Sequence, residues 1–363
     1  MKLLYDHQIF SSQRFGGVSK YFCEMIRNIP GEHTYKISLL LSENQYLNEG
    51  YSIFKKKSIP FRDKDFKGKA FLMRNVYRLN QFYSARSIAA NDFDLLHPTF
   101  YDDYFLKILK KPYIITVHDM IRFKFKEIPG GDLVRLQMEN TIKKANRIIA
   151  VSENTKKDII DILDVNAEKI DVVYHGYNKQ SHIGSTNSYG KYILFVGRRG
   201  YYKNFVPFIS AISELLGKEK DLKLICTGEA FTNDEISKLK ALNILEKTIS
   251  LSVSEHELNS LYSNAQLFVY PSLYEGFGMP VLEAFANNCP VCLSDKSCFP
   301  EIAGSAAIYF DPNNRESILE AVKKILYSDD LKSELINAGK ERLNHFSWKK
   351  TSDETINAYK KVV

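Results

Sequence analysis

Two glutamates lie eight residues apart in the stretch Tyr270–Ala286, which reads YPSLYEGFGMPVLEAFA. A strand is expected to end at Tyr270 and a helix to begin at Pro280, because proline suits the first turn of a helix. Glu275 then lies in the loop and Glu283 on the first helical turn. Carboxylates accept hydrogen bonds from hydroxyl groups, so the pair could hold hydroxyls on either side of a ligand. For Glu283 alone, the simpler interpretation is that its charge complements the helix dipole.

The start of this expected helix is also suited to an anion. The backbone N–H groups from Phe277 through Met279 to Val281 have no partner within the helix, and a helix N-terminus carries partial positive charge. Gly276 and Gly278 let a ligand approach the backbone closely. A diphosphate fits these features best.

A second motif, FVGRRGYYKN at Phe195–Asn204, follows another expected strand. Gly197 turns the chain and delivers Arg198, Arg199 and Lys203 to the carboxyl edge of a sheet. Fixed cations at this edge would neutralise the charge that grows on a departing nucleoside diphosphate. Taken alone, the motif also fits a solvated basic turn.

The first half of the chain offers a glycine pair in RFGGVS, Arg14–Ser19, between the first expected strand and helix. Gly16 and Gly17 allow a phosphate or an acceptor to approach the backbone. The pair lacks the spacing of a dinucleotide fingerprint, which argues against NAD. Taken alone, it is better interpreted as a structural turn.

A histidine follows the fourth expected strand of the first half, in TVHDM, Thr116–Met120. An isolated His118 at a strand end is more often structural than catalytic. Asp119 is its expected orienting partner, and His97 in HPTFY is a weaker candidate for the site.

Short β-branched runs alternate with longer stretches of helical period in both halves, which predicts an α/β protein with parallel sheets. We expect two Rossmann-like, doubly wound domains that face each other across a cleft at the carboxyl ends of their strands. The first domain spans residues 1–178, a polar linker 179–190, and the second domain 191–346. The last helix, 347–363, is expected to pack back on the first domain.

Composition excludes several classes of protein. The first residues, Met1–Ile9, lack the apolar run of a signal peptide, and no segment is apolar for long enough to cross a bilayer. We therefore expect a cytoplasmic protein. Cys289 and Cys292 form a C-x-x-C without a second metal-ligating pair. We therefore expect both to be small, buried apolar side chains rather than metal ligands or redox groups.

Positive charge is concentrated between Lys55 and Arg86, where ten basic residues face only Asp63 and Asp65. Such a patch attracts anionic lipid head groups or nucleic acid. An ordinary solvated helix and loop would also fit. Nucleic-acid binding is disfavoured because aromatic readout motifs are not interleaved with the charges.

The Glu-x7-Glu block in its Pro-Ser-x-x-Glu-Gly-Phe-Gly-x-Pro context resembles the signature of retaining GT-B glycosyltransferases of family four, and other family landmarks follow in order over nearly the whole chain. The resemblance implies that Glu275 contacts donor-sugar hydroxyls and Glu283 the ribose. It implies that Arg198 and Lys203 grip the phosphates, although the doubled arginine departs from many relatives. It places His118 beside the transferred sugar.

Further landmarks extend the resemblance. Leu251–Leu261, which contains Val253, is similar to the segment near the nucleotide base, and the loop at Gly16 and Gly17 is similar to one that lines the family's cleft. Transferases of this kind use basic residues and helix dipoles, so the implied cofactors are none and the implied metal is none. The patterns Asp63–Asp65 and Asp92–Asp94 are accordingly interpreted as surface carboxylates.

The family implies a nucleotide-sugar donor (GDP-mannose or a UDP-sugar) and a glycan or lipid-linked glycan acceptor, in the synthesis of O-antigen, capsule or another exopolysaccharide. Peripheral docking of the Lys55–Arg86 stretch on an anionic membrane face is a hypothesis that follows from such an acceptor. A nucleotide-sugar epimerase, a sugar phosphorylase and a noncatalytic partner of another transferase stay open as alternatives.

Overall fold

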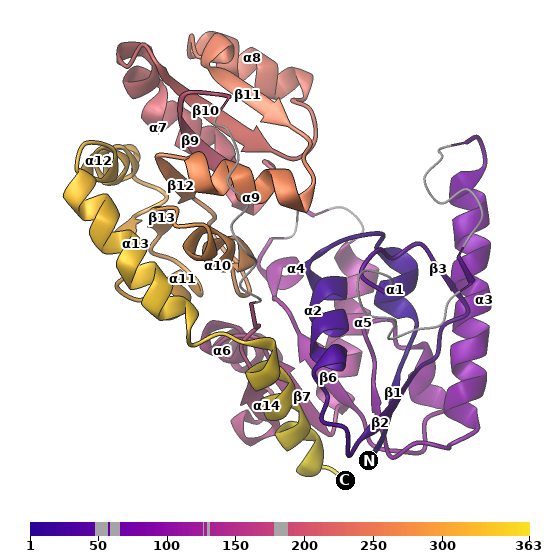
Figure 1. Ribbon diagram of the computed structural model, residues 1–363. Helices are drawn as coiled ribbons and strands as arrows, with labels where there is room; N and C mark the ends of the chain where they lie inside the picture. Colours follow the sequence, from indigo (N-terminus) through magenta and orange to yellow (C-terminus); the bar gives the residue numbers. More distant parts are fainter. Residues whose placement is uncertain (48–56, 59–65, 126, 129–130, 178–187) are drawn as a thin grey trace. The chain divides into compact units, whose positions relative to one another are not determined.

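The computed structural model describes residues 1–47, 57–58, 66–125, 127–128, 131–177 and 188–363. The chain forms two compact units, each with its own parallel β-structure (Figure 1). Unit 1 comprises Met1–Gly176 and Ser347–Val363, and unit 2 comprises Tyr177–Phe346. The predicted linker lies mostly in residues 178–187, outside the described residues.

Unit 1 contains two three-stranded parallel sheets, β2-β1-β5 and β6-β7-β8, which meet at a bridge between Leu96 and Tyr113. A separate two-stranded parallel pair joins β3 and β4. The strands of unit 1 are β1 (Lys2–Tyr5), β2 (Thr34–Ile37), β3 (Leu41–Ser42), β4 (Lys57–Ser58), β5 (Leu95–His97), β6 (Ile114–Val117), β7 (Arg147–Ala150) and β8 (Ile170–Val172). Its α-helices are α1 (Gln8–Ser12), α2 (Gly17–Arg27), α3 (Lys69–Ala89), α4 (Ile121–Lys124), α5 (Gly131–Lys144), α6 (Glu153–Leu163) and α14 (Trp348–Lys360).

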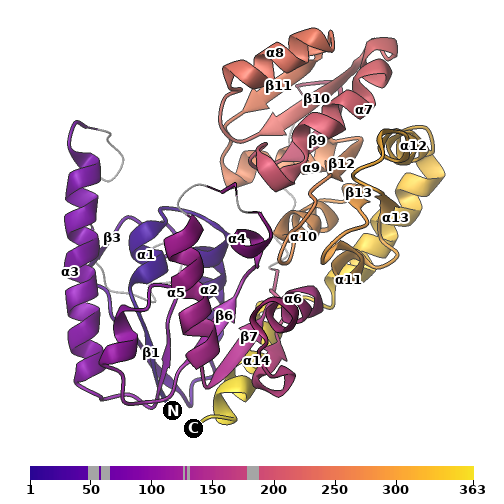
Figure 2. The same cartoon turned by 180° about the vertical axis from the view of Figure 1, so that it is seen from behind.

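Unit 2 is built on one six-stranded parallel sheet in the order β11-β10-β9-β12-β13-β14 (Figure 2). The strands are β9 (Lys191–Val196), β10 (Leu222–Thr227), β11 (Thr248–Leu251), β12 (Leu267–Tyr270), β13 (Val291–Ser294) and β14 (Ile308–Phe310). The helices are α7 (Phe205–Lys218), α8 (Asn233–Ala241), α9 (Glu255–Asn264), α10 (Met279–Ala286), α11 (Phe299–Ala303), α12 (Arg315–Leu326) and α13 (Asp329–Leu343).

The strand order of unit 2 reverses direction between β9 and β12. The chain builds outward from β9 through β10 to β11, then returns to the other side of β9 and continues outward with β12, β13 and β14. This is the doubly wound arrangement expected from the sequence, and ligands of such sheets bind where the order reverses, outside the carboxyl ends of the strands. The point of reversal lies between the two loops that carry the basic and glutamate motifs.

The helix at the end of the chain belongs to unit 1. α14 packs on α2 and β7, and Trp348 is buried. Gly176, the last residue before the chain leaves unit 1, lies against the segment that returns to it. A Cβ atom at Gly176 would lie 2.2 Å from the backbone nitrogen of Trp348 and 2.4 Å from the carbonyl carbon of Ser347. The segment that leaves unit 1 and the segment that returns to it are therefore in contact at Gly176, where only glycine fits.

Buried hydrogen bonds tie α14 to the sheets of unit 1. The two ring nitrogens of His97 bond the Tyr359 hydroxyl (2.5 Å) and the Thr116 hydroxyl (2.9 Å). Tyr359 also bonds Tyr5 (3.0 Å), and Tyr21 bonds Thr116 (3.3 Å). His97 is thus a fully hydrogen-bonded core residue, and its weaker assignment to the site was wrong.

Four buried histidines make unit 1 sensitive to acid. Burial lowers the pKa of His7 to about 4, that of His97 and His118 to about 3, and that of His175 well below its usual value. The unfolded chain therefore binds more protons than the folded chain as pH falls below about 6.5, and stability falls with it by up to about 1.4 kcal/mol per pH unit for each histidine. The carboxyl groups of Asp6 and Glu354, whose pKa values are raised by burial, oppose this effect.

We expect the urea midpoint followed by Trp348 fluorescence to drop between pH 7.5 and pH 5. Trp348 is the chain's single tryptophan and lies in unit 1, so it reports on that unit. The described histidines of unit 2, His256 and His345, are exposed, so hydrogen exchange of β9 and β10 should change less. A Trp348 midpoint that stays constant over this range would contradict the neutral, buried state of the four rings.

Candidate active site

Two loops of unit 2 meet at the point where the strand order reverses. The basic motif leaves the end of β9, turns at Gly197 (φ +107°) and forms a short 3₁₀ turn at Tyr201–Lys203. The glutamate motif leaves the end of β12. The backbone N–H of Leu273 donates to the carbonyl of Tyr202 at 2.7 Å, which fastens one loop to the other.

Lys203 and Glu275 are paired at this junction. The Lys203 ammonium donates to Glu275 Oε1 at 2.6 Å and to the Tyr270 hydroxyl at 3.0 Å, and both charged side chains are largely buried. Burial and the nearby Glu275 carboxylate raise the pKa of Tyr270 well above its usual value, so its hydroxyl stays protonated. The structure thus brings together a cation predicted to hold phosphate and a carboxylate predicted to hold sugar hydroxyls.

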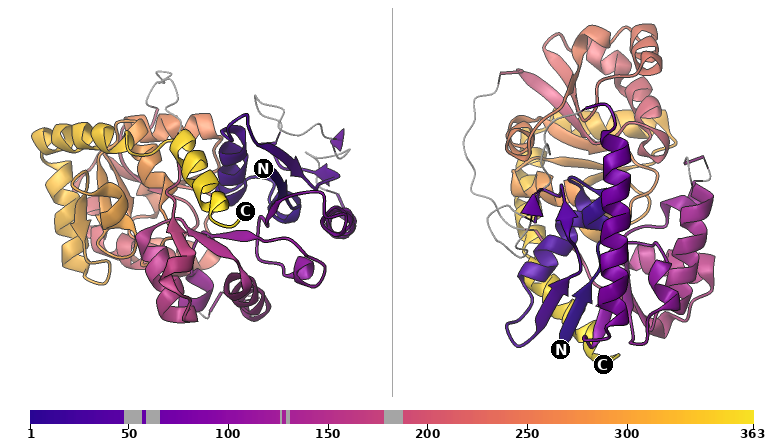
Figure 3. Two further views of the ribbon diagram at one scale, coloured as in Figure 1. Left: turned by 90° about the horizontal axis from the view of Figure 1, so that it is seen from below. Right: turned by 90° about the vertical axis from the view of Figure 1, so that its right-hand side faces the viewer.

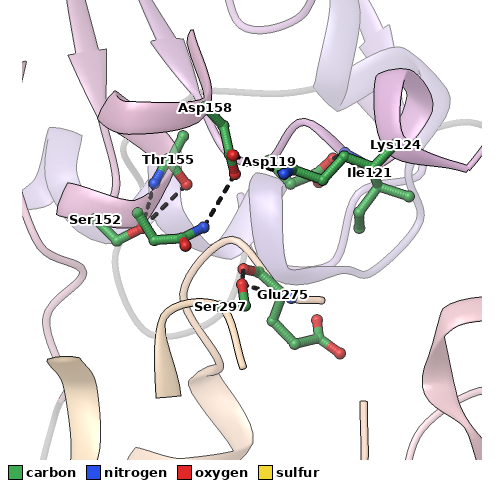
Figure 4. A network of polar contacts seen from close by, with 9 residues as sticks. Asp119, Ile121, Lys124, Ser152, Thr155, Asp158, Glu275 and Ser297 are labelled. Atoms are coloured by element: carbon green, nitrogen blue, oxygen red, sulfur yellow. Dashed lines mark hydrogen bonds and ion pairs between the residues drawn. The ribbon is translucent and has the colours of Figure 1, made fainter. Parts of the chain in front are cut away.

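A serine that the sequence did not single out fixes the backbone of Glu275. The Ser297 hydroxyl accepts from the Glu275 N–H (3.2 Å) and donates to the Glu275 carbonyl (2.6 Å). Ser297 itself is in the left-handed region (φ +59°). Figure 4 shows the Glu275 carboxylate pointing away from this clamp. The loop is held through its backbone, which leaves the carboxylate to pair with Lys203.

The two neighbouring arginines have different environments. Arg199 is buried, its Nε donates to Glu235 Oε1 at 3.0 Å, and its guanidinium lies 4.7 Å from the centre of the Phe231 ring. It also donates to the carbonyls of Glu229 and Ala230. Arg198 is exposed and makes no hydrogen bond or ion pair with any residue that the structure describes. Arg199 therefore holds the 229–231 loop, whereas Arg198 is available to a ligand.

Replacing these arginines singly should separate binding from stability. Arg199→Ala removes a buried cation from Glu235 and should cost about 3 kcal/mol of unfolding free energy. Arg198→Ala should leave the melting temperature unchanged and lower donor turnover about tenfold to a hundredfold. The check is a pair of melting curves beside a donor-turnover assay. Equal melting temperatures for the two variants would contradict this division.

α10 begins at the glutamate motif, one residue earlier than predicted. Gly278 is its N-cap with φ +89° and no side-chain cap, and a Cβ there would lie 3.3 Å from the Phe299 ring. Pro280 has no N–H, and the Val281 N–H donates to the Gly278 carbonyl at 2.9 Å, so the Met279 N–H is the one in the first three helical residues that suits an anion. Glu283 is the fifth helical residue rather than a first-turn residue, so complementing the helix dipole does not explain it. Its Oε2 accepts from the Tyr262 hydroxyl at 3.2 Å.

The other residues of unit 2 that the sequence analysis singled out lie close to the glutamate motif in sequence or beside α9. Phe277 is buried, with its ring edge-on to Phe346 at 5.9 Å. Val253 lines a cavity of about 260 Å³ beside α9. The thiols of Cys289 and Cys292 are both buried, and burial raises the pKa of each, which fits their predicted role as small apolar side chains.

In unit 1, the glycine pair opens α2. Gly16 is the N-cap and Gly17 the first helical residue, and a Cβ at Gly17 would meet no described atom within 4 Å. Among the described residues the D-x-D pattern at Asp92–Asp94 binds Lys2, whose ammonium bonds Asp92 and whose backbone N–H donates to Asp94, both at 2.7 Å. Asp63–Asp65 lies outside the described residues.

His118 follows β6 and is packed among aromatic rings. Its centroid lies 4.9 Å from that of Tyr21 and 5.7 Å from that of His175. Both of its ring nitrogens are buried, and neither has a hydrogen-bond partner among the described residues. Burial lowers its pKa to about 3, so the ring is neutral near pH 7. A neutral imidazole offers one donor and one acceptor to a ligand.

Asp119 does not orient His118, contrary to the prediction. Its Oδ1 accepts the backbone N–H of Ile121 at 3.0 Å, because the turn into α4 leaves that N–H unpaired. Figure 4 shows the neighbouring polar contacts of unit 1, in which Asp158 pairs with Lys124 at 2.7 Å and the Ser152 hydroxyl caps α6.

Two family models match consecutive parts of the chain. "Glycosyltransferase Family 4" matches residues 15–181, and "Glycosyl transferases group 1" matches residues 178–342. Together they extend over both units. The chain is a glycosyltransferase of the family that these two models describe. The resemblance seen in the glutamate block is thereby confirmed.

Two relatives of this glycosyltransferase are named O-antigen chain mannosyltransferases. It is 32% identical to the O-antigen chain mannosyltransferase RfbU of Salmonella typhimurium over 58% of this chain and 60% of RfbU. It is 28% identical to O-antigen chain mannosyltransferase B of Escherichia coli, over 79% and 84% of the two chains. The match to RfbU thus spans about three-fifths of that relative's length.

Solved structures share the fold of this glycosyltransferase. The Anabaena protein Alr3699/HepE, in complex with UDP and glucose, superposes with a TM-score of 0.74 at 15% identity over 99% of both chains. Sucrose-phosphate synthase from Thermosynechococcus elongatus gives 0.73 at 14% identity over 99% and 98%. The predicted GT-B fold class, with Rossmann-like units, is confirmed.

Proposed function

We propose that this glycosyltransferase moves a hexose from a nucleotide-diphosphate sugar to a glycan or lipid-linked glycan, with retention of the anomeric configuration. The observation that carries the proposal is the Lys203–Glu275 pair beside the uncapped start of α10, at the point where the strand order of unit 2 reverses. The Lys203 cation and the backbone amides there suit the oxygens of the leaving diphosphate, and the Glu275 carboxylate suits the sugar hydroxyls.

Residues of unit 2 drive the proposed cleavage of the donor. The anomeric C–O bond to the diphosphate stretches toward an oxocarbenium ion, and the electron pair moves to the phosphate oxygen. Arg198, Lys203 and the amides at the start of α10 stabilise that charge, while Glu275 holds the sugar. The acceptor hydroxyl attacks from the face that the diphosphate leaves and gives its proton to a phosphate oxygen. The new bond thus has the old configuration.

The other predicted residues receive supporting roles in this proposal. Glu283 bonds the ribose, and Val253 lies beside the base. His118 offers its neutral ring to a sugar or acceptor hydroxyl, and the backbone at Gly16 and Gly17 lies beside the acceptor or a phosphate. Because cations and amides neutralise the diphosphate, the proposal requires no metal, and transfer should persist in EDTA.

Mannose from GDP-mannose is the first donor to test, since both O-antigen relatives above are mannosyltransferases. Glucose, galactose and N-acetylhexosamine from UDP-sugars are the next donors. We propose a cytoplasmic protein that meets its lipid-linked acceptor at an anionic membrane face. None of the described helices is long and apolar enough to cross a membrane.

The proposal is tested by thermal shift with GDP, UDP and their sugars, followed by transfer and NMR of the product. A bound nucleotide at a hundred times its Kd stabilises the fold by about 2.7 kcal/mol. We expect one base to raise the melting temperature and the product to keep the donor's anomeric configuration. Inverted product, or consumption of donor equally fast without acceptor, would favour another mechanism or the epimerase alternative.

A further inference from the structure

The outer face of α3 is apolar where a solvent-facing helix is normally polar. Phe71 is 71% exposed and Phe82 61%, with Leu72 and Leu79 also exposed. The inward face is formed by Val76, Asn80, Ser84 and Ile88, at helical spacing. α3 thus carries apolar side chains on both faces, and the described residues of unit 1 cover only one of these faces.

The packing of α3 explains why its outer face stays open. The helix rests on α1 and β3, and the Asn80 carboxamide oxygen accepts the backbone N–H groups of Leu40 (3.0 Å) and Leu41 (3.1 Å). These bonds fix its rotation about its own axis. In the right-hand view of Figure 3, α3 stands at the front of unit 1, and no other described helix or strand of that unit crosses it.

The charge on this face has one sign. Arg74, Arg78 and Arg86 are exposed on α3 and alternate with the aromatic residues, and Arg86 lies 5.7 Å from the centre of the Phe82 ring. No aspartate or glutamate occurs in residues 66–91. Ordinary surface helices carry both signs, so an attraction to an anionic surface is not cancelled here.

We propose that this face of α3 (Phe71, Leu72, Arg74, Arg78, Leu79, Phe82 and Arg86) docks on an anionic lipid bilayer. The arginines bind head-group phosphates, and the phenylalanines enter the boundary between head groups and acyl chains. At 21 residues, α3 extends along the surface for about 30 Å. The inference rests on the proposed function, since a lipid-linked acceptor gives this contact its purpose.

The charge contribution is tested by sedimentation of the full-length protein with vesicles of 30% phosphatidylglycerol in phosphatidylcholine (about a third anionic lipid). Arg74→Glu/Arg78→Glu/Arg86→Glu should lower the partition coefficient at least about tenfold. The matched control Lys218→Glu/Lys238→Glu/Lys240→Glu makes the same net change on exposed lysines of unit 2. It should bind as the unmodified protein does. Equal losses in both variants would overturn a role for α3.

The apolar contribution is tested by Phe71→Ser/Phe82→Ser, beside Leu133→Ser/Leu136→Ser on α5, whose leucines are 67% and 61% exposed. Only the α3 pair should weaken vesicle binding. In a second measurement, Phe82→Trp should be quenched by brominated acyl chains, and Tyr327→Trp in unit 2 should not. Trp348 is buried, so it contributes a constant background. An unquenched Phe82→Trp would overturn insertion.

Two further readings separate this inference from its foundation. Nucleotide-induced thermal shifts should be the same in all α3 variants, because α3 lies in unit 1 and the donor site in unit 2. Vesicle binding without any nucleotide-induced thermal shift would support the docking face and contradict the proposed function. A nucleotide-induced thermal shift without vesicle binding would contradict the docking face alone. Analytical ultracentrifugation that shows a dimer broken by Phe71→Ser/Phe82→Ser, with no vesicle binding, would assign the face to a second copy and overturn the proposal.

Discussion

Glu275→Gln should lower the rate of hexosyl transfer at least about a hundredfold, an effect far larger than the loss of stability it causes. Glutamine has the same shape, and its oxygen can still accept from Lys203, so the loop keeps its conformation, although the buried Lys203 ammonium loses its counter-charge and the melting temperature falls somewhat. What is lost is the negative charge that holds the sugar hydroxyls as positive charge develops at the anomeric carbon. Lys203→Ala should lower transfer by a similar factor, because it removes a cation from the leaving diphosphate.

The two effects should not add, because the side chains touch at 2.6 Å. Residues in direct contact typically couple by about 0.5–3 kcal/mol, so the double variant should lose less than the product of the single factors. Lys218→Ala, at an exposed lysine of the same unit, is the control. Single-turnover rates on one donor and one acceptor give the comparison. A Glu275→Gln variant with at least half the unmodified rate would remove this carboxylate from the chemistry.

Gly176→Ala should destabilise unit 1 strongly. An added Cβ would lie 2.2–2.5 Å from backbone atoms of Ser347 and Trp348, which cannot rotate away as a side-chain tip can. The returning chain must shift, and α14 with it, so we expect a cost of about 3 kcal/mol. α14 contributes Tyr359 to the bonds around His97, so its displacement opens the core of the unit.

The loss should appear in Trp348 itself. In Gly176→Ala, the emission of Trp348 should move to longer wavelength, and the urea midpoint of unit 1 should fall. Gly17→Ala is the matched control, because a Cβ there meets nothing within 4 Å. Unchanged emission and midpoint in Gly176→Ala would show that the return of the chain to unit 1 does not depend on this contact.

The donor loops could be predicted because their signals are local. Glycine and charge occur within both Phe195–Asn204 and Tyr270–Ala286, proline occurs in the second, and each loop directly follows a strand. Parallel strands put their carboxyl ends on one edge, so two such loops meet without further information. The pairing of Lys203 with Glu275 then follows from β9 and β12 being neighbours, a consequence of the doubly wound order.

Other features depend on partners distant in sequence, which no local pattern reveals. The role of Arg199 differs from that of Arg198 because Arg199 contacts Glu235 and the 229–231 loop. Ser297 reaches Glu275 across 22 residues, and His97 reaches Tyr359 across 262. The same holds for Asp119, where bonding to its own turn outcompeted the expected bond to His118.

The most direct measurement of the account is a crystal of the full-length protein grown with GDP or UDP, whichever raises its melting temperature. The account predicts the diphosphate in unit 2, within hydrogen-bond distance of Arg198, Lys203 and the N–H groups at the start of α10. A diphosphate bound away from both donor loops of unit 2 would contradict it.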